Sequence, residues 1–229
     1  MASQKLTACT IHQSDIVDWN QVIANLDSTN SEQQQCVFTE QSTEYIAGYY
    51  IRKLSHRQLQ YNIEGNCFEP VIVENQCVLK FDIYISHGTM MLWGNTKLAN
   101  FFMTLFSQST DNQLIIDYCK TDYCTMINRI IGDPDIKLAR MKIRDIIIED
   151  GIVANCSVNL SNTDTPSKLV KKYIKQISQL TVHLKGSNED TSLTIYSSGS
   201  VVVFKDRTGL AEETLDKIEK IVGGPKDNG

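Results

Sequence analysis

The chain reads SLTIYSSGSVVVFKD from Ser192 to Asp206, and it reads KFDIYISHGTMMLWGN from Lys80 to Asn95. Each stretch is an apolar strand, a short turn that contains Gly, and a second apolar strand, a pattern typical of a β-hairpin. An amphipathic helix is predicted after each hairpin, over 96–109 and within 209–224, where Gly223 is a stop signal. The chain therefore contains the same hairpin-and-helix pattern twice.

A strand and a helix are also predicted upstream of each hairpin. The first half has a strand in KLTACTIHQ and then a helix around Ile16–Leu26. The second half has the β-rich stretch MKIRDIIIEDGIVANCSVNL and then a helix with Thr165 as N-cap and Pro166 at its first position. The buried face predicted for this helix is Leu169, Val170, Tyr173, Ile174 and Ile177. Several strands before a terminal helix favour an α+β fold, in which an antiparallel sheet has helices on one face.

The repeated pattern predicts three regions. Residues 1–106 and 141–229 are the two repeats, and 107–140 is a linking region with an extra strand and a short helix that ends at Asp133–Pro134. Residues 29–36 are predicted to form a polar loop. Two copies are too few to stack as a solenoid, so the repeat favours a pseudo-twofold sheet. The alternative is coincidence, because a hairpin followed by a helix is a common combination.

Composition restricts the class of protein. The 229 residues are 41% hydrophobic and 21% charged, which indicates a globular protein with a sizeable core. The net charge of −5 is unlike that of a general nucleic-acid binder, which has a basic excess. Residues 1–140 hold 10 Lys and Arg against 15 Asp and Glu, whereas 141–229 hold 12 against 12, so an electropositive surface is expected in the second half.

The sequence predicts a soluble, intracellular protein. No apolar run approaches the roughly 18 residues that a membrane span needs, and the first residues lack the pattern of a signal peptide. The seven cysteines favour a reducing compartment with buried thiols.

Conventional catalytic chemistry is missing from the sequence. The phosphate-binding, dinucleotide-binding, zinc-protease and nucleophile-elbow motifs do not occur. The four histidines lack ligand spacing, and Cys119 and Cys124 have no second pair, so no metal or other cofactor is predicted. The sequence predicts a non-enzymatic protein, with an enzyme on an unrelated α+β scaffold as a remote alternative.

Several stretches resemble the TATA-binding protein family. TIYSSGSVVV and DIYISHGTMMLWG resemble the hairpins of its two repeats, MKIRDIII the strand that opens the second repeat, and GNCFEPVIVENQ (Gly65–Gln76) the strand before the first hairpin. The G-x-C-F start and ISHG are most similar to the divergent TATA-binding-like proteins of large DNA viruses. The resemblance implies a curved antiparallel saddle with helices on its convex face. For a viral protein it also implies the nucleus or a cytoplasmic replication site.

In that family, pairs of large side chains on the concave face wedge between base steps of the DNA minor groove. The resemblance puts these wedges at Phe68 and Tyr84 in the first repeat, and at Leu180 and Tyr196 in the second. Strand alternation then adds an apolar floor of Met91, Trp93, Val202 and Phe204. The alternative for each of these side chains is an ordinary place in the core.

The resemblance also indicates polar contacts. Lys5 and Asp145 occupy the positions of two asparagines that read base edges in the family, and Asp145 does not suit a groove lined with acceptors. The candidate phosphate contacts are Lys142, Arg144, Lys168, Lys171, Lys172 and Lys175. A run of charges on a helix, such as the last four, is usually the solvated face of that helix.

These features predict a transcription initiation factor that binds promoter DNA in the minor groove and recruits a TFIIB-like factor and RNA polymerase. A second hypothesis is a non-enzymatic protein-interaction module on the same saddle, with little or no direct DNA binding. The acidic balance of the chain and Asp145 favour this second hypothesis, as does Asp82, which lies where the resemblance implies an apolar floor residue.

Overall fold

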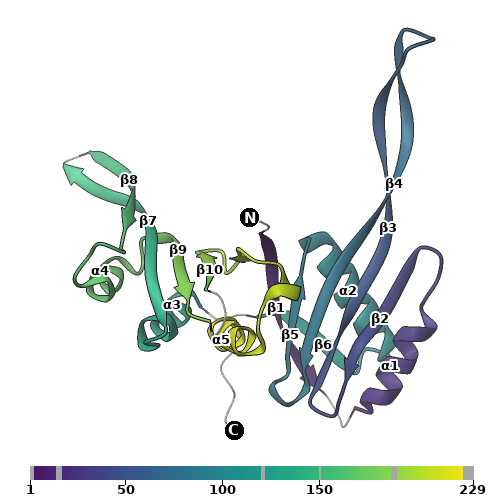
Figure 1. Ribbon diagram of the computed structural model, residues 1–229, viewed down its shortest axis with the longest axis horizontal. Helices are drawn as coiled ribbons and strands as arrows, with labels where there is room; N and C mark the ends of the chain where they lie inside the picture. Colours follow the sequence, from purple (N-terminus) through teal and green to yellow (C-terminus); the bar gives the residue numbers. More distant parts are fainter. Residues whose placement is uncertain (1–2, 14–16, 120–121, 150, 187–189, 224–229) are drawn as a thin grey trace. The chain divides into compact units, whose positions relative to one another are not determined.

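The computed structural model describes residues 3–13, 17–119, 122–149, 151–186 and 190–223 (Figure 1). These residues contain eleven β-strands and five α-helices, and the strand registers are antiparallel, so the fold is α+β as the sequence predicts. The chain divides into two compact units. Unit 1 comprises Met1–Thr10, Thr89–Trp93 and Asp117–Gly229, and unit 2 comprises Ile11–Gly88 and Gly94–Ile116.

The sheet of unit 1 has the strand order β5-β1-β11-β10-β9-β7-β8. Its strands are β1 (Gln4–Gln13), β5 (Thr89–Trp93), β7 (Ile136–Glu149), β8 (Ile152–Asn159), β9 (Ile177–Leu184), β10 (Thr191–Tyr196) and β11 (Val201–Val203). Its helices are α3 (Tyr123–Gly132), α4 (Pro166–Tyr173) and α5 (Glu212–Val222), with a 3₁₀ turn at Arg207–Gly209. The strand β6 (Leu114–Tyr118) continues from unit 2 into unit 1.

One row of side chains across this sheet is apolar and fully buried. The registers align Trp93, Leu6, Val201, Ile195, Leu180 and Met141 on six adjacent strands. None of these residues is more than 2% exposed. The apolar sides of α3 and α5 are buried too, and the two helices contact each other. The helices therefore cover this face. On β8, β7, β9, β10 and β11 the side chains one position along point to the other face, the open face, which Lys5 of β1 also shares, whereas all five residues of β5 are buried.

Unit 2 has the strand order β2-β3-β4. Its elements are α1 (Trp19–Ser28), β2 (Gln34–Gln41), β3 (Tyr45–Asn62), β4 (Cys67–Tyr84) and α2 (Thr96–Ser109), with a 3₁₀ turn at Ile85–His87. Asn95 begins α2 because its side chain accepts a hydrogen bond from the Lys97 amide at 2.7 Å. The ring of Phe102 on α2 stacks on Phe81 of β4 with centroids 4.7 Å apart, which fixes the helix on the sheet.

The strands β3 and β4 extend well beyond the rest of this sheet. The pairing of β2 with β3 ends at Arg52, but β3 and β4 stay paired as far as Asn62 and Cys67. Figure 1 shows the resulting two-stranded ribbon standing apart from its sheet. We call its residues Lys53–Asn62 and Cys67–Gln76 the arm.

Three local predictions need correction. The stretch Gly65–Gln76 was expected to be a separate strand before the hairpin, but β4 runs without a break from Cys67 to Tyr84. The helix at Pro166 ends at Tyr173, so Ile177 is buried in β9 rather than on a helix, and Val170 is the buried residue of α4. The strand β2 already begins at Gln34, within the loop predicted over 29–36. Ile16 lies outside the described residues, and α1 begins at Trp19.

Other predictions are confirmed. The two hairpin strands of the second half, β10 and β11, and the helices α2 and α5 occur where the periodicity predicts them. The linking region holds β6 and α3, the expected strand and short helix. The two repeats at 1–106 and 141–229 stay a prediction, and the compact units follow other boundaries because β1 and β5 join the sheet of the second half.

Candidate nucleic-acid interface

The open face of unit 1 carries polar side chains in register across four strands. The registers pair Ser157 of β8 with Lys142 of β7, Lys142 with Gln179 of β9, and Gln179 with Tyr196 of β10. Paired residues in a sheet point to the same side. Ser157 and Lys142 are exposed, and Gln179 and Tyr196 are half-buried. An aromatic ring thus lies in one row with an amide, an ammonium group and a hydroxyl.

A second row on this face lies two residues away from the first on these four strands, and it continues onto β11 and β1. It contains Asn159, Arg140, Thr181, Thr194, Val202 and Lys5. The hydroxyls of Thr181 and Thr194 are hydrogen-bonded at 2.9 Å. Thr194 is only 1% exposed, and this bond satisfies its buried hydroxyl. Lys5 at one end of the row and Arg140, next to the other end, are exposed.

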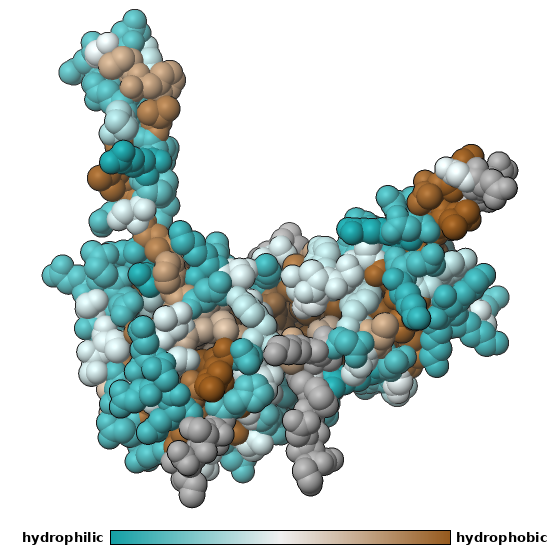
Figure 2. All heavy atoms as spheres, turned by 180° about the vertical axis from the view of Figure 1, so that it is seen from behind, coloured by the Kyte–Doolittle hydropathy of each residue, from teal (hydrophilic) through white to brown (hydrophobic). Residues whose placement is uncertain are grey.

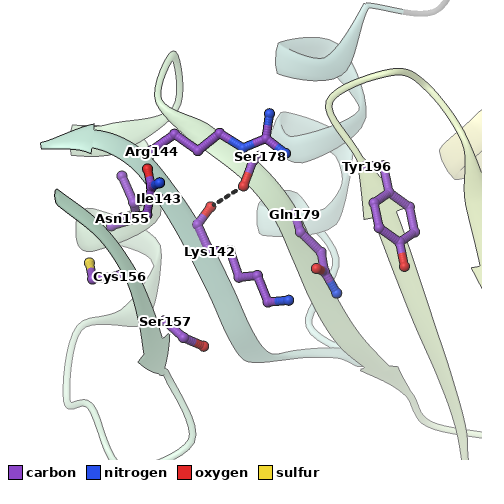
Figure 3. Close-up of a pocket in the computed structure, with 9 residues that line it drawn as sticks. All are labelled: Lys142, Ile143, Arg144, Asn155, Cys156, Ser157, Ser178, Gln179 and Tyr196. Atoms are coloured by element: carbon purple, nitrogen blue, oxygen red, sulfur yellow. Dashed lines mark hydrogen bonds between the residues drawn. The ribbon is translucent and has the colours of Figure 1, made fainter. Parts of the chain in front are cut away.

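A hollow of about 470 Å³ opens on this face around the first row (Figure 3). Its lining residues are Lys142, Ile143, Arg144, Asn155, Cys156, Ser157, Ser178, Gln179 and Tyr196. The Ser178 hydroxyl donates to the Lys142 carbonyl at 3.2 Å, which holds β9 against β7 where the register shifts. In Figure 3 the side chain of Lys142 points toward Gln179, and the Tyr196 ring lies beyond Gln179.

The two rows and the hollow have a positive balance of charge. Their charged residues, among those that the structure describes, are Lys5, Arg140, Lys142 and Arg144. Asp145 follows Arg144 but lies in a β-bulge with φ of 56°, and its amide donates to the Asn155 side chain at 3.2 Å. The bulge takes Asp145 out of the regular alternation of β7.

The structure brings five of the residues predicted from the sequence onto this face. Tyr196, Val202, Lys5 and Lys142 belong to its two rows, and Arg144 lines the hollow. Phe204 follows β11 and is 37% exposed.

Leu180, Met91 and Trp93 are not exposed as a wedge or floor requires. All three are 0% exposed. Leu180 pairs with Ile195 in the apolar row under the helices, whereas Tyr196 pairs with Gln179, so the two predicted wedge positions of the second repeat point to opposite faces. Met91 and Trp93 pair with alternate residues of β1, and Trp93 belongs to the same apolar row as Leu180.

The predicted wedges of the first repeat lie far apart within unit 2. Phe68 and Tyr84 are at opposite ends of β4, and sixteen residues at about 3.3 Å each separate them by about 50 Å. Phe68 pairs with Tyr61 on the arm, and Tyr84 pairs with Tyr45. They cannot act as one pair because a continuous strand replaces the two expected strands.

The lysines predicted as phosphate contacts in the second half fall into two groups. Lys142 is on the open face, but Lys168, Lys171 and Lys172 are exposed on α4 and Lys175 follows that helix. The Lys172 ammonium lies 5.1 Å from the centroid of the Tyr173 ring. These four lysines therefore lie outside the rows of the sheet.

Sequence reasoning missed Arg140, Gln179 and Thr181 of the open face. Alternation along the stretch ISQLTVHL was a usable signal, because it puts Gln179 and Thr181 on one side and Leu180 and Val182 on the other. Arg140 could not be placed in this way, since the register shifts between Leu138 and Arg140.

No known protein-family model matches this chain, and no curated protein is similar to it. Among the described residues, no helix has the length and apolar character to cross a membrane.

Proposed function

We propose that the open face of unit 1 binds duplex DNA and that the protein is a transcription initiation factor like the TATA-binding protein. The observation that supports this proposal best is the alternation of the sheet: one face is buried under helices, and the other has Tyr196 in register with Gln179 and Lys142. Proteins that bind the minor groove use Arg, Lys, Asn and Gln together with an inserted ring or aliphatic side chain.

Each group has a defined task in this proposal. The Gln179 amide donates to the acceptor atoms that line the minor groove at A·T pairs. Lys142, Arg144 and Arg140 neutralise phosphates, and Tyr196 stacks on a base step at the rim of the hollow. A saddle made of two repeats, and recruitment of a TFIIB-like factor and RNA polymerase, belong to the proposal through the sequence resemblance.

The test is the binding of a fluorescent A·T-rich duplex at low salt, measured by anisotropy. We expect the wild type to bind and Tyr196→Ala to lose about tenfold in affinity, as removal of a stacking ring does in other nucleic-acid complexes. Phe68→Ala is the matched control, because it removes an exposed ring from unit 2. Absence of duplex binding by the wild type, or an equal loss in the two variants, contradicts the proposal.

A further inference from the structure

The arm of unit 2 presents an apolar surface that DNA binding by unit 1 does not use. Its registers pair Tyr61 with Phe68, Leu59 with Pro70, and Arg57 with Ile72. Because paired residues share a side and every second residue points the same way, these six side chains form one surface, which we call the arm face. Figure 2 shows hydrophobic side chains along the arm.

The arm face is exposed to an unusual degree. The exposed fractions are 66% for Leu59, 46% for Tyr61, 66% for Phe68 and 70% for Ile72. The rings of Tyr61 and Phe68 are in contact, with centroids 5.2 Å apart. A two-stranded ribbon with no packed layer has marginal stability in water, and contiguous exposed apolar surface marks interaction sites. The arm face is therefore a surface to be covered by a partner.

The other side of the arm has a different character. There the registers pair Gln60 with Glu69, Gln58 with Val71, His56 with Val73, and Leu54 with Asn75, so this side mixes polar and apolar residues. The Asn62 amide donates to the Glu69 carboxylate at 3.0 Å, which satisfies polar groups within the ribbon itself. Leu54, Val71 and Val73 on this side are half-buried. The most exposed large apolar side chains of the arm, Leu59, Tyr61, Phe68 and Ile72, all lie on the arm face, which indicates that a partner approaches from that side.

The chemistry of the arm face suits a protein partner. Exposed aromatic rings and Arg are enriched in protein interfaces, whereas an interface for nucleic acid is more strongly cationic. The charges on this side of the arm are Arg57 and Lys53 against Glu74, which the Ser55 hydroxyl contacts at 3.4 Å. A net positive rim beside an apolar strip is complementary to a partner that is apolar and acidic.

The size of the arm face indicates a short segment. Ten residues of each strand at about 3.3 Å give a length of about 33 Å, and two strands with their side chains are about 10 Å wide. The resulting area of roughly 300–400 Å² is well below the 800 Å² or so that each partner buries in a stable dimer. A second copy or a globular domain would need a larger contact area, whereas this area is enough for an extended or helical segment.

We propose that the arm face binds an apolar, acidic segment of another protein. This inference is independent of DNA binding by unit 1, and both can be measured on the same variants.

The experiment selects peptides of about twelve residues, long enough to span the arm, from a random phage-displayed library on the immobilised full chain. We expect enriched peptides to combine large apolar residues with Asp or Glu. Phe68→Ser should weaken the binding of a selected peptide at least about tenfold, as truncation of a hot-spot ring does. The matched control is Gln60→Ser, on the other side of the same ribbon, which should leave peptide affinity unchanged.

Reversing the charge of Arg57 should change the residue preference of the selected peptides, which misfolding of the variant would not do. A library selected on Arg57→Glu should lose its acidic preference and enrich Lys or Arg. No enrichment on the wild type, or enriched peptides that bind Phe68→Ser equally well, overturns the proposal. A loss of duplex binding in Phe68→Ser equal to that in Tyr196→Ala assigns the arm to DNA and also overturns it, as does dimerisation of the wild type that Phe68→Ser abolishes.

Discussion

Leu180 and Gln179 are neighbours on β9, and the structure assigns them to opposite faces of the sheet. Leu180 is 0% exposed in the apolar row, and Gln179 is half-buried beside Tyr196. Leu180→Ala removes methyl and methylene groups that contribute about 0.8 kcal/mol each. With the cavity that remains, we expect the free energy of unfolding of unit 1 to fall by about 3 kcal/mol. Gln179→Ala should change it by less than about 0.5 kcal/mol.

The two tryptophans of the chain, Trp19 in unit 2 and Trp93 in unit 1, allow this to be measured. In a Trp19→Phe background, the fluorescence of Trp93, which lies in the same row as Leu180, follows the unfolding of unit 1 in urea. At a slope of about 1.5 kcal/mol/M, Leu180→Ala should lower the midpoint by about 2 M.

The two variants should have the opposite order of effects on duplex binding. Folded Leu180→Ala should bind DNA like the wild type, whereas Gln179→Ala should lose about 1 kcal/mol of binding free energy with its amide donor. If Leu180→Ala keeps its stability and loses DNA binding, then Leu180 is an exposed wedge, and the assignment of faces given by the registers is refuted.

Three more predictions follow from particular contacts. Lys142→Ala should reduce the slope of log affinity for duplex DNA against log salt by about 0.9, whereas Lys172→Ala on α4 should leave it unchanged in the same titration. Arg129→Ala removes a guanidinium that donates to three carbonyls at the end of α5, so unit 1 should lose about 1–2 kcal/mol of unfolding free energy in urea. Burial raises the pKa of the Cys9 and Cys36 thiols to about 12, above the usual 9 that the unfolded chain retains. Stability from these thiols is complete below pH 9 and is lost between pH 9 and 12. Each thiol should therefore lower the free energy of unfolding by about 1 kcal/mol at pH 10, a loss that alanine variants do not show in urea denaturation.

Local pattern predicted much of the fold because the deciding interactions are close in sequence. The helix α2 follows from the stripe that includes Phe102 and Phe106 and from the cap at Asn95, all within fifteen residues. The prediction that a separate strand ends at Gln76 was wrong, because β4 continues through the polar residues there. Those residues are exposed positions of the arm, which has no buried face.

The candidate site was harder to predict than the fold. Tyr196 and Lys5, assigned through the family resemblance, lie on the open face, as does Val202, assigned by alternation from Tyr196. Leu180, assigned from the spacing of the wedge pair in the first repeat, does not. A shift of one residue along a strand exchanges the two faces of a sheet. The bulge at Asp145 and the register shift at Arg140 change that parity locally, and both depend on pairing with distant strands.

The place of β1 between β5 and β11 has a consequence for biosynthesis. Gln4 pairs with Val203, so β1 finds one of its neighbours about 200 residues later in the chain, a strongly non-local contact. Until then β1 lacks this neighbour, and its unpaired edge can pair with other chains or be bound by chaperones. Unit 1 can therefore complete its folding only after β11 has been synthesised.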